Sequence, residues 1–189
     1  MMSTDAHAGS MPSTRRELSR EEKMGDIVTA AARRLGEGGY NAVSIAGIAR
    51  ELGIAHNAVY WYFPSKDDLV VAAFRHKVHE LMARKPKDSG DVVERVMWFV
   101  ERLGKLYPVR ASLHSAARDS PVIAAYLDEL SSRLNELARH VLAGYVDADE
   151  LDVAAASFIA TVQGAFLEGI PPKERRRLLT FSLRRLIGQ

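Results

Sequence analysis

Cysteine is absent from this sequence of 189 residues, which excludes disulfide bonds, thiol catalysis and zinc sites built on cysteine. No run of about 18 consecutive apolar residues occurs either, so no membrane-spanning helix is predicted. Residues 1–14 lack the apolar core of a secretory signal, and their small and polar side chains predict a disordered leader. Together these absences favour a cytoplasmic protein.

An excess of charge of one sign is also nearly absent, because 26 Lys and Arg face 24 Asp and Glu and leave a formal net charge of +2. So small an excess does not establish nucleic-acid binding, and any affinity for DNA must depend on where the charges lie. Hydrophobic residues make up 47% of the chain, which is enough for a packed core. The length suits one generous domain, or a small domain joined to a larger one.

Strand signals are scarce, whereas apolar residues recur with helical spacing between clusters of glycine and proline, so the sequence predicts an all-α fold. A capping box from Ser19 to Glu22 predicts the start of the first helix, and the glycines at 36–39 predict its end. A second capping box, from Ser65 to Asp68, predicts the start of a long fourth helix before a polar loop at 85–90. About nine helices are expected in all: 19–35, 45–51, 55–62, 66–81, 91–106, 108–118, 121–144, 150–169 and 173–187.

Residues 45–64 carry the pattern that bears most on function. Ala49 is small enough for two short helices to cross closely, and Gly53 tolerates the positive φ that the turn between them needs. The spacings that face a small core are occupied by Ile48, Leu52, Ile54, Val59 and Tyr62. This is the layout of a helix-turn-helix, whose second helix enters the major groove of DNA. An ordinary helical hairpin fits the same spacing, but the polar and aromatic side chains of the second helix favour contact with phosphates and base edges.

The stretch from Ile27 to Phe74 resembles the DNA-binding domain of the TetR family of transcriptional regulators. The resemblance covers about a quarter of the chain, and the remainder is similar to the family only in length and helical organisation. It implies a helix-turn-helix DNA-binding domain at 15–66 and a larger helical domain for effector binding and dimerisation at 67–189. The matching elements are Ile27, Ala30-Ala31, Gly39-Tyr40, Ser44, Ile48-Ala49, Leu52-Gly53-Ile54 and the run from Val59 to Leu69.

The resemblance also implies roles for single residues. Ser44, Tyr60 and Lys66 match positions that contact backbone phosphates, and the positive end of a helix is expected to help Lys66. Asn57 is the residue expected to read a base, such as adenine, through its amide. The positions that usually face the groove are matched by His56, Asn57, Ala58, Trp61 and Tyr62.

Two features near this motif leave its details open. Ala55 stands where a serine often caps the recognition helix, at an expected cost of about 1 kcal/mol. The pair at 56–57 is not the commonest one at these positions, so the operator sequence does not follow from it. Arg15, Arg16 and Arg20 form either an arm that reaches the DNA backbone or minor groove, or a solvated cluster before the first helix.

The last two predicted helices, 150–169 and 173–187, are rich in apolar residues, and the first of them is apolar nearly all round. Such a helix must be buried on more than one side, either inside one domain or at an interface. The family resemblance implies that these helices form a four-helix interface between two copies. A homodimer is favoured, because one small helix-turn-helix reads too few bases to bind tightly. The basic run at 173–185 is expected to lie on a solvated face.

Aromatic and polar side chains of the larger region are the candidate effector contacts, although each type is also common in packed cores. Trp98 lies nearly opposite the core stripe of its helix and faces either solvent or a second buried surface. If it lines a cavity, a mostly apolar ligand is expected. No cofactor or metal site is predicted, since His76 and His79 have no third ligand nearby in the sequence. The candidates are Trp98, Tyr107, His114, Tyr126, Phe158 and Gln163.

These observations favour a sequence-specific DNA-binding transcriptional regulator: a repressor that a small, mostly apolar effector releases from a palindromic operator. Repression is implied by the family resemblance alone, so an activator of the same architecture stays open. A non-specific architectural DNA-binding protein is a third reading, and it predicts equal affinity for all sequences. No catalytic constellation, phosphate loop or carboxylate pair indicates an enzyme.

Overall fold

The computed structural model describes residues 15–83 and 91–188, and within these ranges the chain forms nine helices and no strand. The all-α prediction is confirmed, while the predicted leader at 1–14 and the polar loop at 85–90 lie outside the described residues. No helix in the described part is long and apolar enough to cross a membrane. The helices are α1 (Arg15–Ala42), α2 (Ile45–Leu52), α3 (His56–Tyr60), α4 (Lys66–Met82), α5 (Val92–Gly104), α6 (Tyr107–Ala116), α7 (Pro121–Leu142), α8 (Leu151–Leu167) and α9 (Pro172–Leu186).

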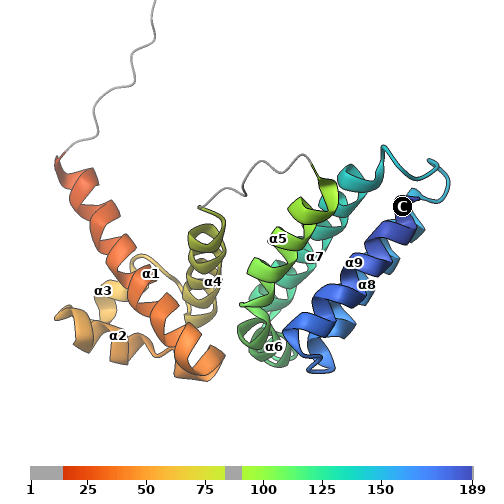
Figure 1. Cartoon of the computed structure of the whole chain (residues 1–189). Helices are drawn as coiled ribbons and strands as arrows, with labels where there is room; N and C mark the ends of the chain where they lie inside the picture. The colour runs from red at the N-terminus through yellow and green to blue at the C-terminus, as the bar shows by residue number, and fades with distance from the viewer. Residues whose placement is uncertain (1–14, 84–90, 189) are drawn as a thin grey trace, which may run out of the picture.

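The helices form two groups that meet at α4 and α6. Helices α1 to α3 make one end of the molecule, α4 stands beside them, and α5, α7, α8 and α9 lie together at the other end (Figure 1). Helix α1 packs on α4 and α6, while α8 packs on both α7 and α9. Because α4 also contacts α5 and α7, it joins the two groups.

Helix α1 begins earlier than predicted and ends where the glycines indicate. It starts at Arg15, so the expected capping box at Ser19 is wrong. Residues 15–18 are all good helix formers, and no breaker separates them from Ser19. At the other end, Gly38 and Gly39 leave the helical conformation, and Gly39 has a φ of 67°.

The two short helices that follow are defined by their caps. The Ser44 side chain accepts a hydrogen bond from the Gly47 amide at 3.2 Å, and Gly53 ends α2 in the left-handed conformation at φ 64°. Helix α3 is shorter than the predicted 55–62 segment and ends at Tyr60. The amides of residues 62 and 63 both donate to the Val59 carbonyl, which turns the chain out of the helix.

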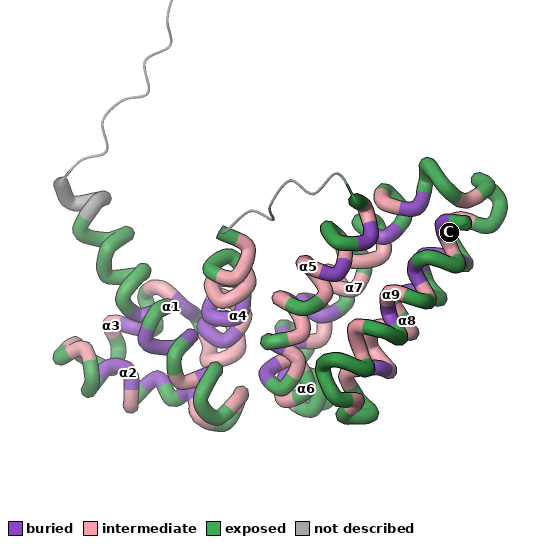
Figure 2. Tube along the Cα trace, viewed as in Figure 1, coloured by how far each residue is buried: buried purple, intermediate pink, exposed green. Residues whose placement is uncertain are grey.

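Buried residues, purple in Figure 2, form two clusters. The first joins α1 to α4 with α6 and the start of α7, through residues such as Ile27, Phe74 and Leu113. The second joins α5, the end of α7, α8 and α9, around residues such as Met97 and Leu183. The first cluster continues past the predicted domain boundary at 66–67.

Candidate nucleic-acid interface and ligand pocket

Helix α3 is held from beneath by one side chain and presents most of the others to solvent. Val59 is fully buried against the first core cluster. His56 and Asn57 are exposed, and Trp61, just after the helix, keeps 81% of its surface exposed. The surface therefore combines an exposed indole with an amide and an imidazole, whose hydrogen-bonding groups suit phosphates and base edges.

The remaining predicted DNA contacts lie around this helix in different states of burial. Ala58 and Tyr62 are partly buried, whereas Tyr60 is exposed, with its ring 5.3 Å from that of His56. Ser44 is exposed, and its oxygen already caps α2, which leaves its O–H free to donate.

Lys66 is the predicted phosphate contact that the structure holds most firmly. It is partly buried, with its ammonium 3.9 Å from the centre of the Tyr40 ring. Burial lowers the pKa of Lys66. The side chain is therefore positioned at the start of α4 by an aromatic face before any partner arrives.

An ion-pair cluster that the sequence analysis missed fixes α2 to α1. Glu51 accepts hydrogen bonds from Arg33 and Arg34, each at 2.8 Å. These bonds hold the pKa of Glu51 below its usual value. Because α2 supports α3, this cluster helps to set the orientation of the exposed helix.

A second polar cluster, which we call the joint, links the two groups of helices. The Tyr40 hydroxyl donates to one oxygen of Asp67 at 2.7 Å, and the Ser120 hydroxyl donates to the other at 2.6 Å. The Ser112 hydroxyl accepts from the Tyr40 amide at 3.1 Å and lies where a side chain on Gly39 would stand. Burial and the bond to Asp67 raise the pKa of Tyr40 to about 12. The joint thus connects the end of α1, the start of α4, the middle of α6 and the start of α7.

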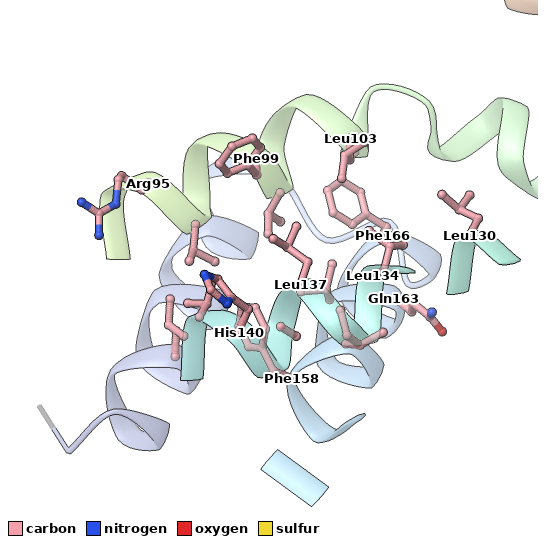
Figure 3. A pocket seen from close by; sticks show the side chains of 18 of the residues that line it. Arg95, Phe99, Leu103, Leu130, Leu134, Leu137, His140, Phe158, Gln163 and Phe166 are labelled. Atoms are coloured by element: carbon pink, nitrogen blue, oxygen red, sulfur yellow. The ribbon is translucent and has the colours of Figure 1, made fainter. Parts of the chain in front are cut away.

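A cavity of about 440 Å³ lies among α4 to α9. Figure 3 shows side chains from α5, α7 and α8 pointing into it, with Arg95 at one end and Leu130 at the other. Its size is within the range of small-molecule sites, and its wall is mostly aliphatic and aromatic. Representative wall residues are Phe99, Leu103, Leu134, Leu137, Phe158 and Phe166.

One part of the wall depends on a residue without a side chain. A methyl group on Gly104 would overlap the Phe166 ring, so α5 accommodates this ring only because residue 104 is glycine. The ring stacks on Tyr107, with centres 5.5 Å apart, and the Arg175 guanidinium covers it at 4.1 Å. Phe166 is therefore held from several sides at the junction of α5 and α6.

The structure separates the predicted effector contacts into two sets. Tyr107, Phe158 and Gln163 line the cavity, so their role as effector contacts stays a prediction. Trp98, His114 and Tyr126 do not line it.

Each of the three residues outside the wall has another environment. Trp98 packs edge-on against Phe99, its ring centre 4.9 Å away, and its face lies 4.4 Å from the Arg102 guanidinium. His114 is exposed on α6, while Tyr126 is buried in the first core cluster. Whether Trp98 lines a cavity was left open by the sequence; the neighbouring Phe99 lines it and Trp98 does not.

Three wall residues carry basic side chains, and the sequence analysis missed them all: Arg95, Arg110 and His140. Arg95 and His140 are exposed, whereas Arg110 is partly buried. The Nε of Arg110 is inaccessible to solvent and has no hydrogen-bond partner. Burial lowers the pKa of this guanidinium.

The outer faces of α8 and α9 expose large apolar side chains in the single chain. Val153 is 72% exposed, Leu167 68% and Phe181 60%, and Leu178 is exposed as well. Helix α8 packs on α7 and α9 and lines the cavity, but Val153 and Leu167 show that part of its surface is uncovered within one chain.

Comparison with known proteins identifies the family. Residues 27–73 match the model of the tetR family of bacterial regulatory proteins. The HTH-type transcriptional regulator BetI of Brucella suis is 30% identical over 156 residues, which cover 77% of this chain and 76% of that protein. The chain belongs to the TetR family. It is a DNA-binding transcriptional regulator, and the predicted family and function class are confirmed.

Solved structures show the same TetR fold over most of the chain. A transcriptional regulator from Rhodococcus sp. Rha1 has a TM-score of 0.71 at 23% identity and covers 87% of this chain and 96% of its own. A regulator from Saccharomonospora viridis in complex with choline has a TM-score of 0.68 at 22% identity and covers the same shares. The fold is thus shared with proteins of low sequence identity.

Proposed function

We propose that this TetR-family protein is a homodimeric repressor that leaves a palindromic operator when a small, mostly apolar effector fills its pocket. In this proposal residues 15–66 bind DNA, and residues 67–189 bind the effector and the second copy. The observation that carries it is the exposed surface of α3, with Trp61 81% exposed, in a chain that also encloses an apolar cavity of about 440 Å³.

Contacts with DNA are assigned to the exposed and anchored side chains around α3. We assign phosphate contacts to Ser44, Tyr60 and Lys66, because each is a donor on the same end of the molecule. Asn57 is assigned the base contact, since its amide is exposed and suits the paired donor and acceptor of adenine. The groove-facing surface is completed by His56, Ala58, Trp61 and Tyr62.

The second copy is assigned to the uncovered face of α8 and α9. Val153 and Leu167 lie near opposite ends of α8, with Phe181 on the neighbouring α9. A twofold axis there buries the same face on both copies and creates a four-helix interface. Such a dimer carries two α3 helices, which the proposal assigns to half-sites about 34 Å apart.

Release from DNA is assigned to α6, because it belongs to both the pocket and the joint. Tyr107 and Arg110 line the cavity, and Ser112 contacts the Tyr40 amide. A ligand that favours a different position of α6 would alter the contacts of α1 with α6 at the joint. Such an effector must bind the two conformations with different affinity, since equal affinity shifts nothing.

Choline, which is bound in the Saccharomonospora viridis structure, is not assigned as the ligand of this chain. Aromatic faces such as those of Phe99 and Phe166 suit a quaternary ammonium ion. Among the described residues, however, the wall contains no Asp or Glu to balance its charge.

The test begins with selection of the operator from random DNA by the full-length protein. We expect a palindrome, with binding at least a thousandfold tighter than to unrelated DNA at physiological salt. Asn57→Ala should weaken operator binding by about 1–3 kcal/mol and relax the preference at one position in each half-site. Asn135→Ala on α7 is the matched control and should leave binding unchanged.

Three results would contradict the proposal. Equal affinity for all sequences would indicate an architectural DNA-binding protein. If the protein raises transcription in vitro from a promoter that carries the selected site, it is an activator. Normal sequence preference in Asn57→Ala would show that α3 does not read bases through this amide.

A further inference from the structure

We propose that the ligand of the pocket is an amphipathic organic anion, a carboxylic acid whose carboxylate pairs with Arg110 while its apolar body fills the cavity. This inference rests on the proposed role of the pocket as an effector site. It adds the charge of the ligand, the position of its head group and the direction in which it lies.

Arg110 differs from every comparable arginine in the described chain. Five arginines with described side chains are partly buried: 34, 102, 110, 175 and 176. Arg34 and Arg176 bond to carboxylates, and Arg102 and Arg175 donate to backbone carbonyls. Arg110 has no such acceptor, and its buried Nε is unpaired. A guanidinium taken partly out of water without a partner is costly, so this position is explained by a partner that binds later.

The charge of the cavity wall also favours an anionic ligand. Of the described residues that line the cavity, two are arginines and none is an aspartate or glutamate. A cationic ligand would therefore enter a site with uncompensated positive charge, whereas an anion would neutralise it. The carboxylate is the favoured head group, because its two oxygens match the planar fork of the guanidinium.

The positions of the two arginines give the ligand a direction. Arg95 and Gly104 are nine residues apart on α5, so about 14 Å separates them along the helix. Arg110 follows on α6, beyond the Gly104 end, while Arg95 and the exposed His140 lie at the other (Figure 3). Exposed Arg95 is already solvated and gains little from an anion, whereas Arg110 gains a partner. The carboxylate thus binds at the α6 end, and the apolar body extends along α5 and α7.

Tyr107 and Phe166 complete the proposed head-group site. Tyr107 lines the same wall and precedes Arg110 by three residues on α6. Its ring is held by stacking on Phe166, so its hydroxyl is positioned on a rigid group. Arg110 is only two residues from Ser112 of the joint, and a carboxylate bound here therefore acts directly on the helix that contacts α1.

The experiment compares ligands that share a tail and differ only in their head group. Decanoate, 1-decanol, methyl decanoate and decyltrimethylammonium are titrated into the full-length protein by calorimetry, below their micellar concentrations. We expect decanoate to bind roughly ten- to a hundredfold more tightly than the two uncharged compounds, and the cation to bind most weakly. A second series, 2-naphthylacetate against 2-(2-naphthyl)ethanol, repeats the comparison with a bulky tail.

Variants locate the effect. Arg110→Met replaces the aliphatic part of the side chain without its charge and should remove the tenfold or greater advantage of decanoate, while 1-decanol binds within about twofold of the wild type. Arg110→Lys should retain part of the advantage, because a point charge replaces the fork. Arg95→Met is the matched control and should leave it intact. Unchanged binding of 1-decanol by each variant shows that the pocket is still folded.

The outcomes separate this inference from the function on which it rests. If 1-decanol and decanoate bind equally, or if Arg110→Met changes nothing, the anion is wrong and an apolar effector stands. Preference for decyltrimethylammonium would likewise overturn the inference alone. If no compound of either series binds, both the anionic ligand and the apolar effector site are wrong.

Discussion

The two ends of the molecule differ in how tightly they are packed and in what they expose. At the end formed by α1 to α3, the core is filled and ion pairs such as those of Glu51 fix the helices, so that function lies in the exposed side chains of α3. At the end formed by α5 to α9, a cavity stays open, Arg110 is unpaired, and the outer face of α8 and α9 is uncovered. The first end is complete as a single chain. In the second, the open cavity and the uncovered face are the places where we propose that an effector and a second copy bind.

The largest expected effect comes from preventing the second copy of the chain from packing on α8 and α9. Phe181→Glu places a charge on the uncovered face and should convert the dimer to a monomer. Operator affinity should then fall by at least a hundredfold, because two linked half-sites are replaced by one. Size-exclusion chromatography with light scattering and DNA titration measure the two effects.

Val122→Glu, which changes an exposed valine on α7, is the control and should leave the dimer intact. A Phe181→Glu protein that is still dimeric and binds its operator normally would show that the two copies meet elsewhere.

A smaller effect distinguishes the packed end from the hollow one. Ile48 is fully buried in the first cluster, so Ile48→Ala should lower the free energy of unfolding by about 2–5 kcal/mol. Leu103 already borders the cavity and is partly buried, so Leu103→Ala removes fewer contacts and should cost clearly less. Urea denaturation of both variants gives the comparison. Equal losses would mean that the pocket end is as tightly packed as the DNA-binding end.

The smallest effect concerns the joint between the two ends. The folded protein raises the pKa of Tyr40 from 10.0 to about 12, so it favours the neutral phenol. This contribution to stability is fully present below pH 10 and is lost as the pH rises toward 12. Tyr40→Phe should therefore flatten the decline in stability between pH 10 and 12, as measured by thermal unfolding at each pH. A variant with the same decline as the wild type would show that other groups cause it.

Much of the DNA-binding end follows from the sequence, because its signals are local. Ser44 and Gly53 mark the ends of α2 by their own chemistry, and the spacing of Ile48 and Val59 identifies the buried side. The start of α1 was missed, since a capping sequence at Ser19 does not act when helix formers precede it.

The pocket depends on relations between distant segments, which the sequence does not display. Trp98 and Phe99 are neighbours, yet one residue turns the side chain by about 100° around the helix, and only Phe99 lines the cavity. Nor does the sequence pattern around Arg110 distinguish a solvated arginine from one that is partly buried. The pairing of Tyr40, Asp67 and Ser120 spans 80 residues and was equally hidden.

Gly104 affects the length of the cavity, because it leaves space for the Phe166 ring. Because even a methyl group there would displace the Phe166 ring, replacement by alanine would push that ring into the chamber and shorten it beside Arg110. Long ligands would lose affinity before short ones, whereas the charge of the site would not change. Under the proposed ligand binding, Gly104 thus limits the length of the ligand and Arg110 selects the charge of its head group, so each can change without the other.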